Sequence, residues 1–340
     1  MPVPEAMKFY AKRLGYPQSE TMGKILSTIF DTEGKQKIAG LLPASATTLA
    51  QKTGIAVGEV EAILKELRYF GAISRNQKIN QEEDVFLLYP GIIELRDAVL
   101  LTPNVDLAMV EMWDHVIREE MPETLPLWEK LNIPPLMRTI PVEAAVDSRS
   151  TVLDVDSARS IIENARQIVV IPCVCRSSRH KLNKSPDCPA PEDAHICMLV
   201  NLFGQEALER GIGTLVTKEE ALVKLKAAED AGLVHMTRNN VKEDLALCNC
   251  CSCCCTGLFM VNQIKYHAFA PSRFRIKLNE EECVGCGTCV DRCQFHAIEC
   301  DDIARIDLDC CYGCGNCVPT CPNEALILEE IRPKEFIRVT

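Results

Sequence analysis

The sequence predicts an α+β protein with a helical N-terminal module, a cysteine-rich α/β middle domain and a small C-terminal domain. Residues 22–89 carry apolar side chains at helical spacing. The middle part combines short β-branched runs with a capped helix, and the C-terminal part holds two regularly spaced cysteine runs. We expect four segments, with the bounds 1–95, 96–150, 151–270 and 271–340.

In the N-terminal module, three helical stretches are followed by two short apolar runs. The third stretch has its apolar residues on one helical face, and Gly71 ends it. This order resembles the winged-helix modules of transcription regulators, with the two apolar runs as the strands of the wing. The expected helices are Met22–Phe30, Thr47–Thr53 and Val57–Phe70, and the expected strands are Ala72–Ser74 and Val85–Tyr89.

The charge of the third helix argues against DNA binding, which this resemblance would imply. Its exposed positions hold Glu59, Glu61 and Glu66 against only Lys65 and Arg68. Contacts to phosphates supply most of the affinity of such modules. We therefore expect the module to form docking or homodimer contacts, followed by short connecting helices in the proline-rich segment.

The middle segment is predicted to place cysteines at the ends of strands. The β-branched run Gln167–Ile171 reads as a buried strand that leads to the first pair of cysteines. A capping box at Thr217-x-x-Glu220 opens a helix, and Leu233–Arg238 reads as a strand leading to six cysteines in eight residues. The candidate metal ligands are Cys173, Cys175, Cys188, Cys197, Cys248, Cys250, Cys251 and Cys253.

The dense cysteine run cannot converge on a single metal in an extended chain. Cys248 and Cys250 would point to one face, and Cys251, Cys253 and Cys255 to the other. The run therefore supplies one cluster on each side, or completes a site begun by the cysteines after the first strand. We expect at least one further iron–sulfur cluster; a zinc site and redox-active thiols are the alternatives. Nearby basic residues would offset cluster charge, bind an anionic substrate or form a solvated loop: Arg176, Arg179, His180, Lys181 and Lys184.

The C-terminal segment repeats one cysteine pattern. Cys283-x2-Cys286-x2-Cys289-x3-Cys293 is followed by Cys311-x2-Cys314-x2-Cys317-x3-Cys321-Pro322. The double pattern resembles two-cluster bacterial ferredoxins, in which the fourth cysteine of each run ligates the other cluster. A zinc site is the alternative, but zinc spacing lacks the third and fourth cysteine of each run. The resemblance implies one [4Fe–4S] cluster on Cys283, Cys286, Cys289 and Cys321, and a second on Cys311, Cys314, Cys317 and Cys293.

The sequence departs from the ferredoxin pattern at Gln294, which stands where a proline follows the fourth cysteine. Cys300 and Cys310 are additional, and we do not expect them to be ligands. Within residues 272–332, the resemblance implies outer strands at Arg273–Leu278 and Ala325–Glu330 and a short helix at Pro322–Ala325.

The composition narrows the class of protein. Of the 340 residues, 47% are hydrophobic, yet no apolar run approaches about 18 residues, so we expect a soluble protein without a membrane span. Twenty cysteines without an evident signal peptide favour metal ligation in the reducing cytoplasm over disulfides. The net charge of −11 argues against broad attraction to nucleic acid and anionic lipid. Residues 271–340 hold 13 acidic and 8 basic residues, which favours docking onto a basic redox partner protein, with solubility alone as the alternative.

Motifs for other cofactors are missing: there is no Walker A loop, no complete dinucleotide fingerprint and no C-x-x-C-H haem motif. The order CVCR, AGLVH, CNCCSCCC is also similar to a group of uncharacterised ferredoxin-containing iron–sulfur proteins of anaerobes. These features predict an electron-transfer protein that connects the ferredoxin-type clusters with the middle site and a partner oxidoreductase. Two alternatives stay open: a reductase whose middle cluster has an open coordination position, and a redox-sensing DNA-binding regulator.

Overall fold

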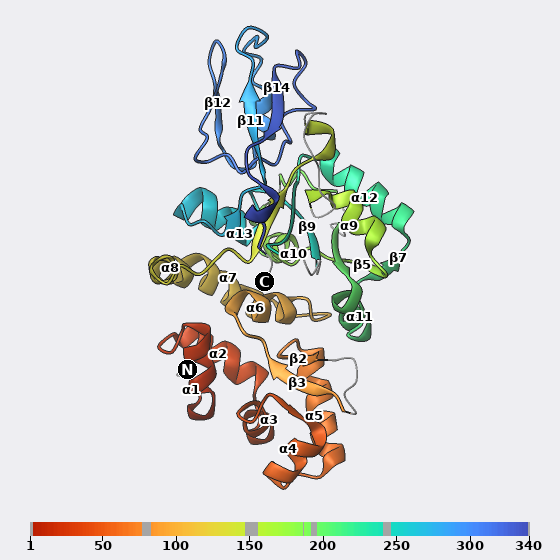
Figure 1. Ribbon diagram of the computed structural model, residues 1–340. Helices are drawn as coiled ribbons and strands as arrows, with labels where there is room; N and C mark the ends of the chain where they lie inside the picture. The colour runs from red at the N-terminus through yellow and green to blue at the C-terminus, as the bar shows by residue number, and fades with distance from the viewer. Residues whose placement is uncertain are drawn as a thin grey trace. The chain divides into compact units, whose positions relative to one another are not determined.

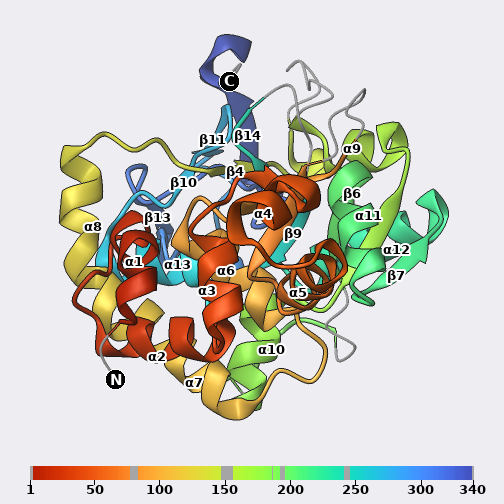
Figure 2. The ribbon, with the colours of Figure 1, turned by 90° about the horizontal axis from the view of Figure 1, so that it is seen from below.

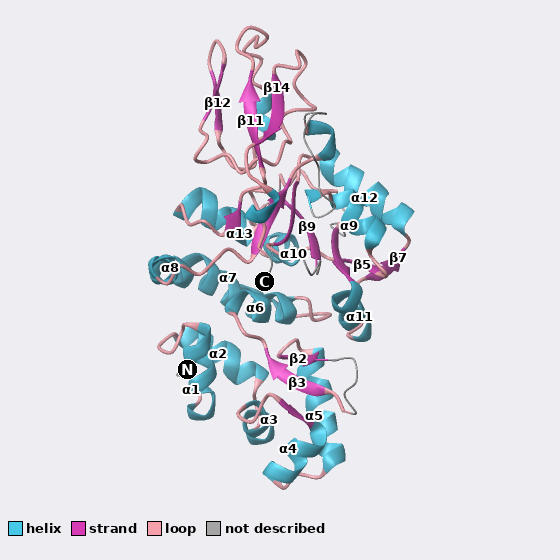
Figure 3. Cartoon of the chain, viewed as in Figure 1, coloured by secondary structure: helices cyan, strands magenta, loops and turns pink. Residues whose placement is uncertain are grey.

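The computed structural model describes residues 3–76, 83–146, 156–185, 187–191, 196–240 and 246–338. The chain divides into two compact units, Met1–Pro126 and Leu127–Thr340. Both units contain helices and strands, so the predicted α+β class is confirmed (Figure 1, Figure 3). Among the described residues, no helix has both the length and the apolar character that crossing a bilayer requires.

In the first unit, helices surround a small sheet with strand order β1-β3-β2. Ser19, Thr32 and Ser45 cap α2, α3 and α4, because each side chain accepts a hydrogen bond from the backbone N–H three residues later. The helices are α1 Lys8–Leu14, α2 Glu20–Ile29, α3 Glu33–Ala39, α4 Ala46–Thr53, α5 Val57–Tyr69, α6 Ile92–Leu100 and α7 Leu107–His115, with α8 Met121–Lys130 at the boundary; the strands are β1 Ala44–Ser45, β2 Ile73–Asn76 and β3 Val85–Leu88.

The three helices and two strands expected in the N-terminal module are present as α2, α4, α5, β2 and β3, and α3 is an additional helix between the first two. The third helix buries Val60, Leu64 and Leu67, as its periodicity predicts. The carboxylate of Glu66 on this helix forms an ion pair with the buried Lys35 of α3, with 2.6 Å between Lys35 Nζ and Glu66 Oε1. Glu66 stays exposed, as the sequence predicts, and its charge is paired with Lys35.

The second unit contains a mixed sheet with strand order β10-β4-β8-β9-β6-β5-β7. Neighbouring strands are antiparallel except β10 and β4, which are parallel. The predicted buried strand after residue 166 is β5, and all four of its residues are buried. The strands are β4 Met137–Ile140, β5 Ile168–Ile171, β6 Cys197–Val200, β7 Thr214–Val216, β8 Val234–Arg238, β9 Ala246–Cys250 and β10 Phe269–Ala270.

Helices cover the β5–β7 side of this sheet. Figures 1 and 2 both place α9, α11 and α12 there, and the apolar faces of α9 and α12 share a core with β5 and β9. The predicted capping box is present at the start of α12, where Thr217 and Glu220 bond reciprocally. The helices of this region are α9 Ala158–Asn164, α10 Val174–Lys181, α11 Asn201–Glu209, α12 Lys218–Asp230 and α13 Thr256–Phe259.

The C-terminal part of the second unit is built on two strand pairs. The predicted outer strands are present as β11 Phe274–Leu278 and β14 Leu326–Glu330, which pair antiparallel. A second hairpin joins β12 Ile298–Cys300 to β13 Ala304–Ile306. The helix expected at Pro322–Ala325 is wrong: the chain forms a turn there, and Glu324 takes a left-handed φ of 51° that ends any helical path. The short helix of this part is α14, Thr288–Arg292.

Two contacts fix this C-terminal part against the end of α12. Arg292 donates to the carbonyl oxygens of Glu229 and Asp230, at 2.8 and 2.9 Å. The buried side chain of Asn316 donates to the carbonyl of Gly232 at 3.0 Å. Both cysteine-run loops are therefore anchored to the middle domain by hydrogen bonds to carbonyls at and just after the C-terminus of α12.

Candidate metal centres

The first cysteine run and the last cysteine of the second run line one hollow. Its walls include Cys283, Cys286, Cys289 and Cys321, together with the additional Cys300 at the end of β12. The backbone N–H of Ala304 donates to the Cys283 sulfur at 3.4 Å. The structure thus brings together the four residues that the ferredoxin resemblance assigns to one cluster, and it adds a fifth thiol that sequence reasoning left out.

The second hollow is lined by Cys293, Cys311, Cys314 and Cys317. It is the less exposed of the two cysteine sets, since Cys317 is buried and the other three are half-buried, whereas Cys286 in the first set is exposed. Burial raises the pKa of the Cys314 thiol to about 12 and that of Cys317 well above its usual value. A bound cluster would supply positive charge that offsets this cost of ionisation, so the chemistry of this set fits a metal cluster.

Glycine backbone shapes both hollows. Gly285 has a φ of +63°, and a Cβ there would lie 2.4 Å from the carbonyl oxygen of Asp302. Gly313 has a φ of +64°, and its Cβ would lie 2.2 Å from the carbonyl oxygen of Phe274. The tight curl of each loop therefore requires glycine, as expected for backbone that bends around the corner of a cluster.

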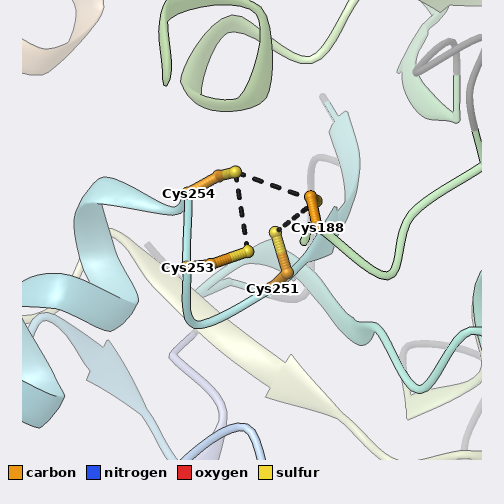
Figure 4. Close-up of side chains that lie close together, drawn as sticks. All are labelled: Cys188, Cys251, Cys253 and Cys254. Atoms are coloured by element: carbon orange, nitrogen blue, oxygen red, sulfur yellow. Dashed lines mark hydrogen bonds between the residues drawn. The ribbon is translucent and has the colours of Figure 1, made fainter. Parts of the chain in front are cut away.

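Four cysteines of the middle domain converge into a compact set, which we call the four-thiol group (Figure 4). Cys188 comes from the loop after α10, and Cys251, Cys253 and Cys254 come from the turn after β9. All four sulfur atoms lie within 4.8 Å of one another. The sulfur–sulfur distances are 3.6 Å for Cys188–Cys251, 3.6 Å for Cys253–Cys254 and 3.8 Å for Cys188–Cys254.

These distances fit a small site. A tetrahedral thiolate site with metal–sulfur bonds of about 2.3 Å has sulfur–sulfur edges of about 3.8 Å. The four-thiol group thus matches the size of a single tetrahedral ion, which zinc or iron satisfies.

The buried Arg176 supplies positive charge to the four-thiol group. Its Nε donates to the Cys188 sulfur at 3.4 Å, and its Nη2 donates to the Cys251 sulfur at 3.6 Å. Burial disfavours the charged guanidinium, but the thiolates of Cys173 and Cys251 raise the Arg176 pKa above its usual value. Arg176 Nη2 also donates to the carbonyl oxygen of Asn249 at 3.2 Å, so the sulfur atoms are the partners that can carry a balancing negative charge, as thiolates. Of the other basic residues predicted to surround the site, Arg179 is half-buried and the rest are exposed at the end of α10: His180, Lys181 and Lys184.

The remaining six cysteines of the middle domain form a second set, which we call the six-thiol ring. Its members come from the ends of β5, β6 and β9 and from the starts of α10 and α13. The register of β6 and β9 places Cys197 opposite Cys248, and Cys250 and Cys255 pack in one apolar cluster. The Cys175 sulfur lies 3.6 Å from Oγ1 of Thr256, the residue after Cys255. Neighbouring thiols and burial raise the pKa of Cys173 and Cys250 well above its usual value.

The turn after β9 changes the expected alternation of the dense run. Cys248 and Cys250 do separate from Cys251 and Cys253, as an extended chain predicts. The strand ends at Cys250, however, and residues 252–254 form a turn. Cys254 consequently joins the four-thiol group, while Cys255 caps α13 and joins the six-thiol ring. Neither Cys254 nor Cys255 was among the predicted ligands. Ser252 could have indicated the turn, because serine is a common turn residue.

Gln294 connects the ferredoxin-type part to the middle domain. Its buried side-chain oxygen accepts a 2.7 Å hydrogen bond from the backbone N–H of Ser252, between Cys251 and Cys253. Beside it, Phe295 and Tyr312 stack with ring centroids 4.6 Å apart and planes 5° from parallel. The pair lies in one apolar cluster with Cys250 and Cys255 of the ring, and cysteines of the second hollow pack against the same cluster: Cys293, Cys311 and Cys314.

Comparison with known families identifies the C-terminal domain. Residues 276–299 and 304–327 each match the family described as the 4Fe-4S binding domain. Each match contains one complete cysteine run, so this domain is a 4Fe–4S binding domain of the kind found in two-cluster ferredoxins. No curated protein and no solved structure matches the chain, and the wider resemblance to iron–sulfur proteins of anaerobes stays a prediction.

Proposed function

We propose that this protein transfers single electrons between a redox partner and metal centres in its middle domain, through two [4Fe–4S] clusters. When bound, each cluster supplies a one-electron redox couple. The cluster ligands are those implied by the ferredoxin pattern, and the two hollows support that assignment because each is lined by one crossed set of four cysteines. The free state of all twenty cysteines agrees with a reducing cytoplasm.

The exposed end of this path is the first hollow. Cys286 is exposed, and the surface around its loop is acidic, with Glu280, Glu281, Glu282, Asp301 and Asp302 all exposed. An acidic surface beside an exposed redox site attracts a basic partner and raises the association rate at low salt. We therefore assign docking of the partner oxidoreductase to this face.

The proposed electron path reaches the middle domain at the contact between Gln294 and Ser252. This contact is the observation that carries the proposal. Gln294 follows the cluster ligand Cys293 directly, and Ser252 lies between two members of the four-thiol group. Phe295 and Tyr312 are buried and stack within the apolar cluster that contains ring members and cysteines of the second hollow. A hydrogen-bonded contact of this kind holds two redox sites at a fixed separation.

Reduction of the full-length protein tests the proposal. A low-potential reductant should reduce the ferredoxin clusters first and then an iron centre of the middle domain, each followed by EPR. Cys314→Ser should remove the second cluster and slow reduction of the middle centre at least tenfold, whereas Cys310→Ser, outside both ligand sets, should not. Equal rates in the two variants, or a middle domain that contains zinc and no iron, would refute the electron path.

The two alternatives gain no support. A catalytic cluster with an open coordination position would be favoured by fewer than four thiols at a site, yet each set described above has at least four. A DNA-binding regulator would need a basic third helix, and the pairing of Glu66 with Lys35 does not provide one. A homodimer formed through the N-terminal module remains a prediction.

A further inference from the structure

The six-thiol ring has more ligands than a single ion or a single cubane uses. A structural metal ion takes four thiolates, and so does one [4Fe–4S] cluster. The four-thiol group already accounts for a compact set of four sulfurs, and none of its members belongs to the ring. The six further thiols are gathered at one end of three adjacent strands and at the starts of α10 and α13, and they thus define a separate and larger site.

The sheet determines why these six thiols meet. In the antiparallel register of β5 and β6, Ile171 lies opposite Cys197, and Cys173 follows two residues later. The register of β6 and β9 pairs Met198 with Leu247, so its next step brings Cys197 opposite Cys248. The ring is therefore seated at one end of three adjacent strands, and α10 and α13 start there as well.

The surroundings suit a charged metal centre that is shielded from water. Four ring members are buried, and Cys175 and Cys248 are half-buried. Arg176 lies between the two thiol sets: it contacts Cys188 and Cys251 directly, and its charge acts on Cys173 and Cys197 of the ring. A buried guanidinium placed in this way offsets the negative charge that a thiolate-bound cluster carries.

We propose that the six-thiol ring holds a polynuclear iron–sulfur centre, larger than one cubane or with bridging thiolates, and distinct from the four-thiol group. This inference deepens the proposed function by naming the middle-domain centre that exchanges electrons with the second ferredoxin cluster. Its position supports that role, since Cys250 and Cys255 share one apolar cluster with the Phe295–Tyr312 stack.

Metal analysis of the full-length protein, purified without oxygen, tests the inference. Wild-type protein should contain clearly more than the about eight irons of two cubanes, with acid-labile sulfide in proportion. Cys197→Ser and Cys250→Ser, on two different strands, should each lower iron and sulfide towards about eight. Cys253→Ser, in the four-thiol group, should remove about one metal ion and no sulfide, and Cys310→Ser should change neither.

Two results would overturn the assignment: ring variants that keep wild-type iron and sulfide, or zinc in the amount lost from them. The EPR signal of the ferredoxin clusters reports folding in every sample, and Cys175→Ser, at a half-buried position, replaces any ring variant that loses that signal. The electron path is judged separately. A ring that holds iron and sulfide but is not reduced through the ferredoxin clusters refutes the proposed function and leaves the site intact.

Discussion

Gln294→Leu tests the connection between the ferredoxin-type part and the cysteine-rich turn. Leucine is close to glutamine in size, but it has no acceptor for the N–H of Ser252, which now donates to Gln294 Oε1 at 2.7 Å. Leaving a shielded backbone N–H without a partner costs about 1–3 kcal/mol. Because the cost falls on the turn itself, local opening of residues 251–255 should become about 5- to 150-fold more frequent.

Amide hydrogen exchange measures that opening directly. Exchange of the Ser252 amide should accelerate by the stated factor in Gln294→Leu, whereas Gln205→Leu, the same change on α11, should leave it unaltered. Reduction of the middle-domain centre should slow in the same variant, because the separation between the two redox sites is no longer fixed. Unchanged exchange at Ser252 would show that the hydrogen bond does not hold the turn and would remove the main support for the electron path.

Three further predictions concern the cluster loops and the support of the C-terminal domain. Gly285→Ala should lower the iron content of the first cluster, because its Cβ would lie 2.4 Å from a carbonyl oxygen. Gly287→Ala carries the same strain of a positive φ, +76°, but has nothing within 4 Å of its Cβ, so it should retain more of the cluster; equal iron in both would contradict the steric argument. Cys293→Ser should damage the EPR signal of the cluster held by the second run, and Cys321→Ser that of the first, so damage confined to each variant's own run would refute the crossed ligation. Asp156→Asn should destabilise the second unit by about 3–5 kcal/mol in denaturant unfolding, because it removes the buried carboxylate that lies 2.7 Å from Arg273 and 3.7 Å from the buried Arg138, although Glu330 still pairs with Arg273. Glu329→Gln, which removes an exposed partner of Lys277, serves as the control and should have little effect, and similar losses in both would discount the buried pair.

Local patterns were enough to find the ferredoxin-type domain and several elements around it. The cysteine spacing of the two runs is a local property, since three ligands of one cluster lie within seven residues of chain. The family comparison matches both runs. The capping box of α12 and the apolar face of α5 could also be predicted from sequence, because capping and helical periodicity depend on residues three or four apart.

The division of the ten middle-domain cysteines into two sets could not be predicted from local sequence patterns. Alternation along an extended chain separated Cys250 from Cys251 correctly, but it failed beyond the end of β9, where a turn sends Cys254 and Cys255 to different sets. Cys173 and Cys197 are more than twenty residues apart, and only the antiparallel register of β5 and β6 brings them together. Strand register depends on the packing of a whole sheet, so no short window of sequence contains it. The role of Gln294 has the same origin: along the chain it is a departure from a motif, and its partner Ser252 is specified by the fold of the middle domain.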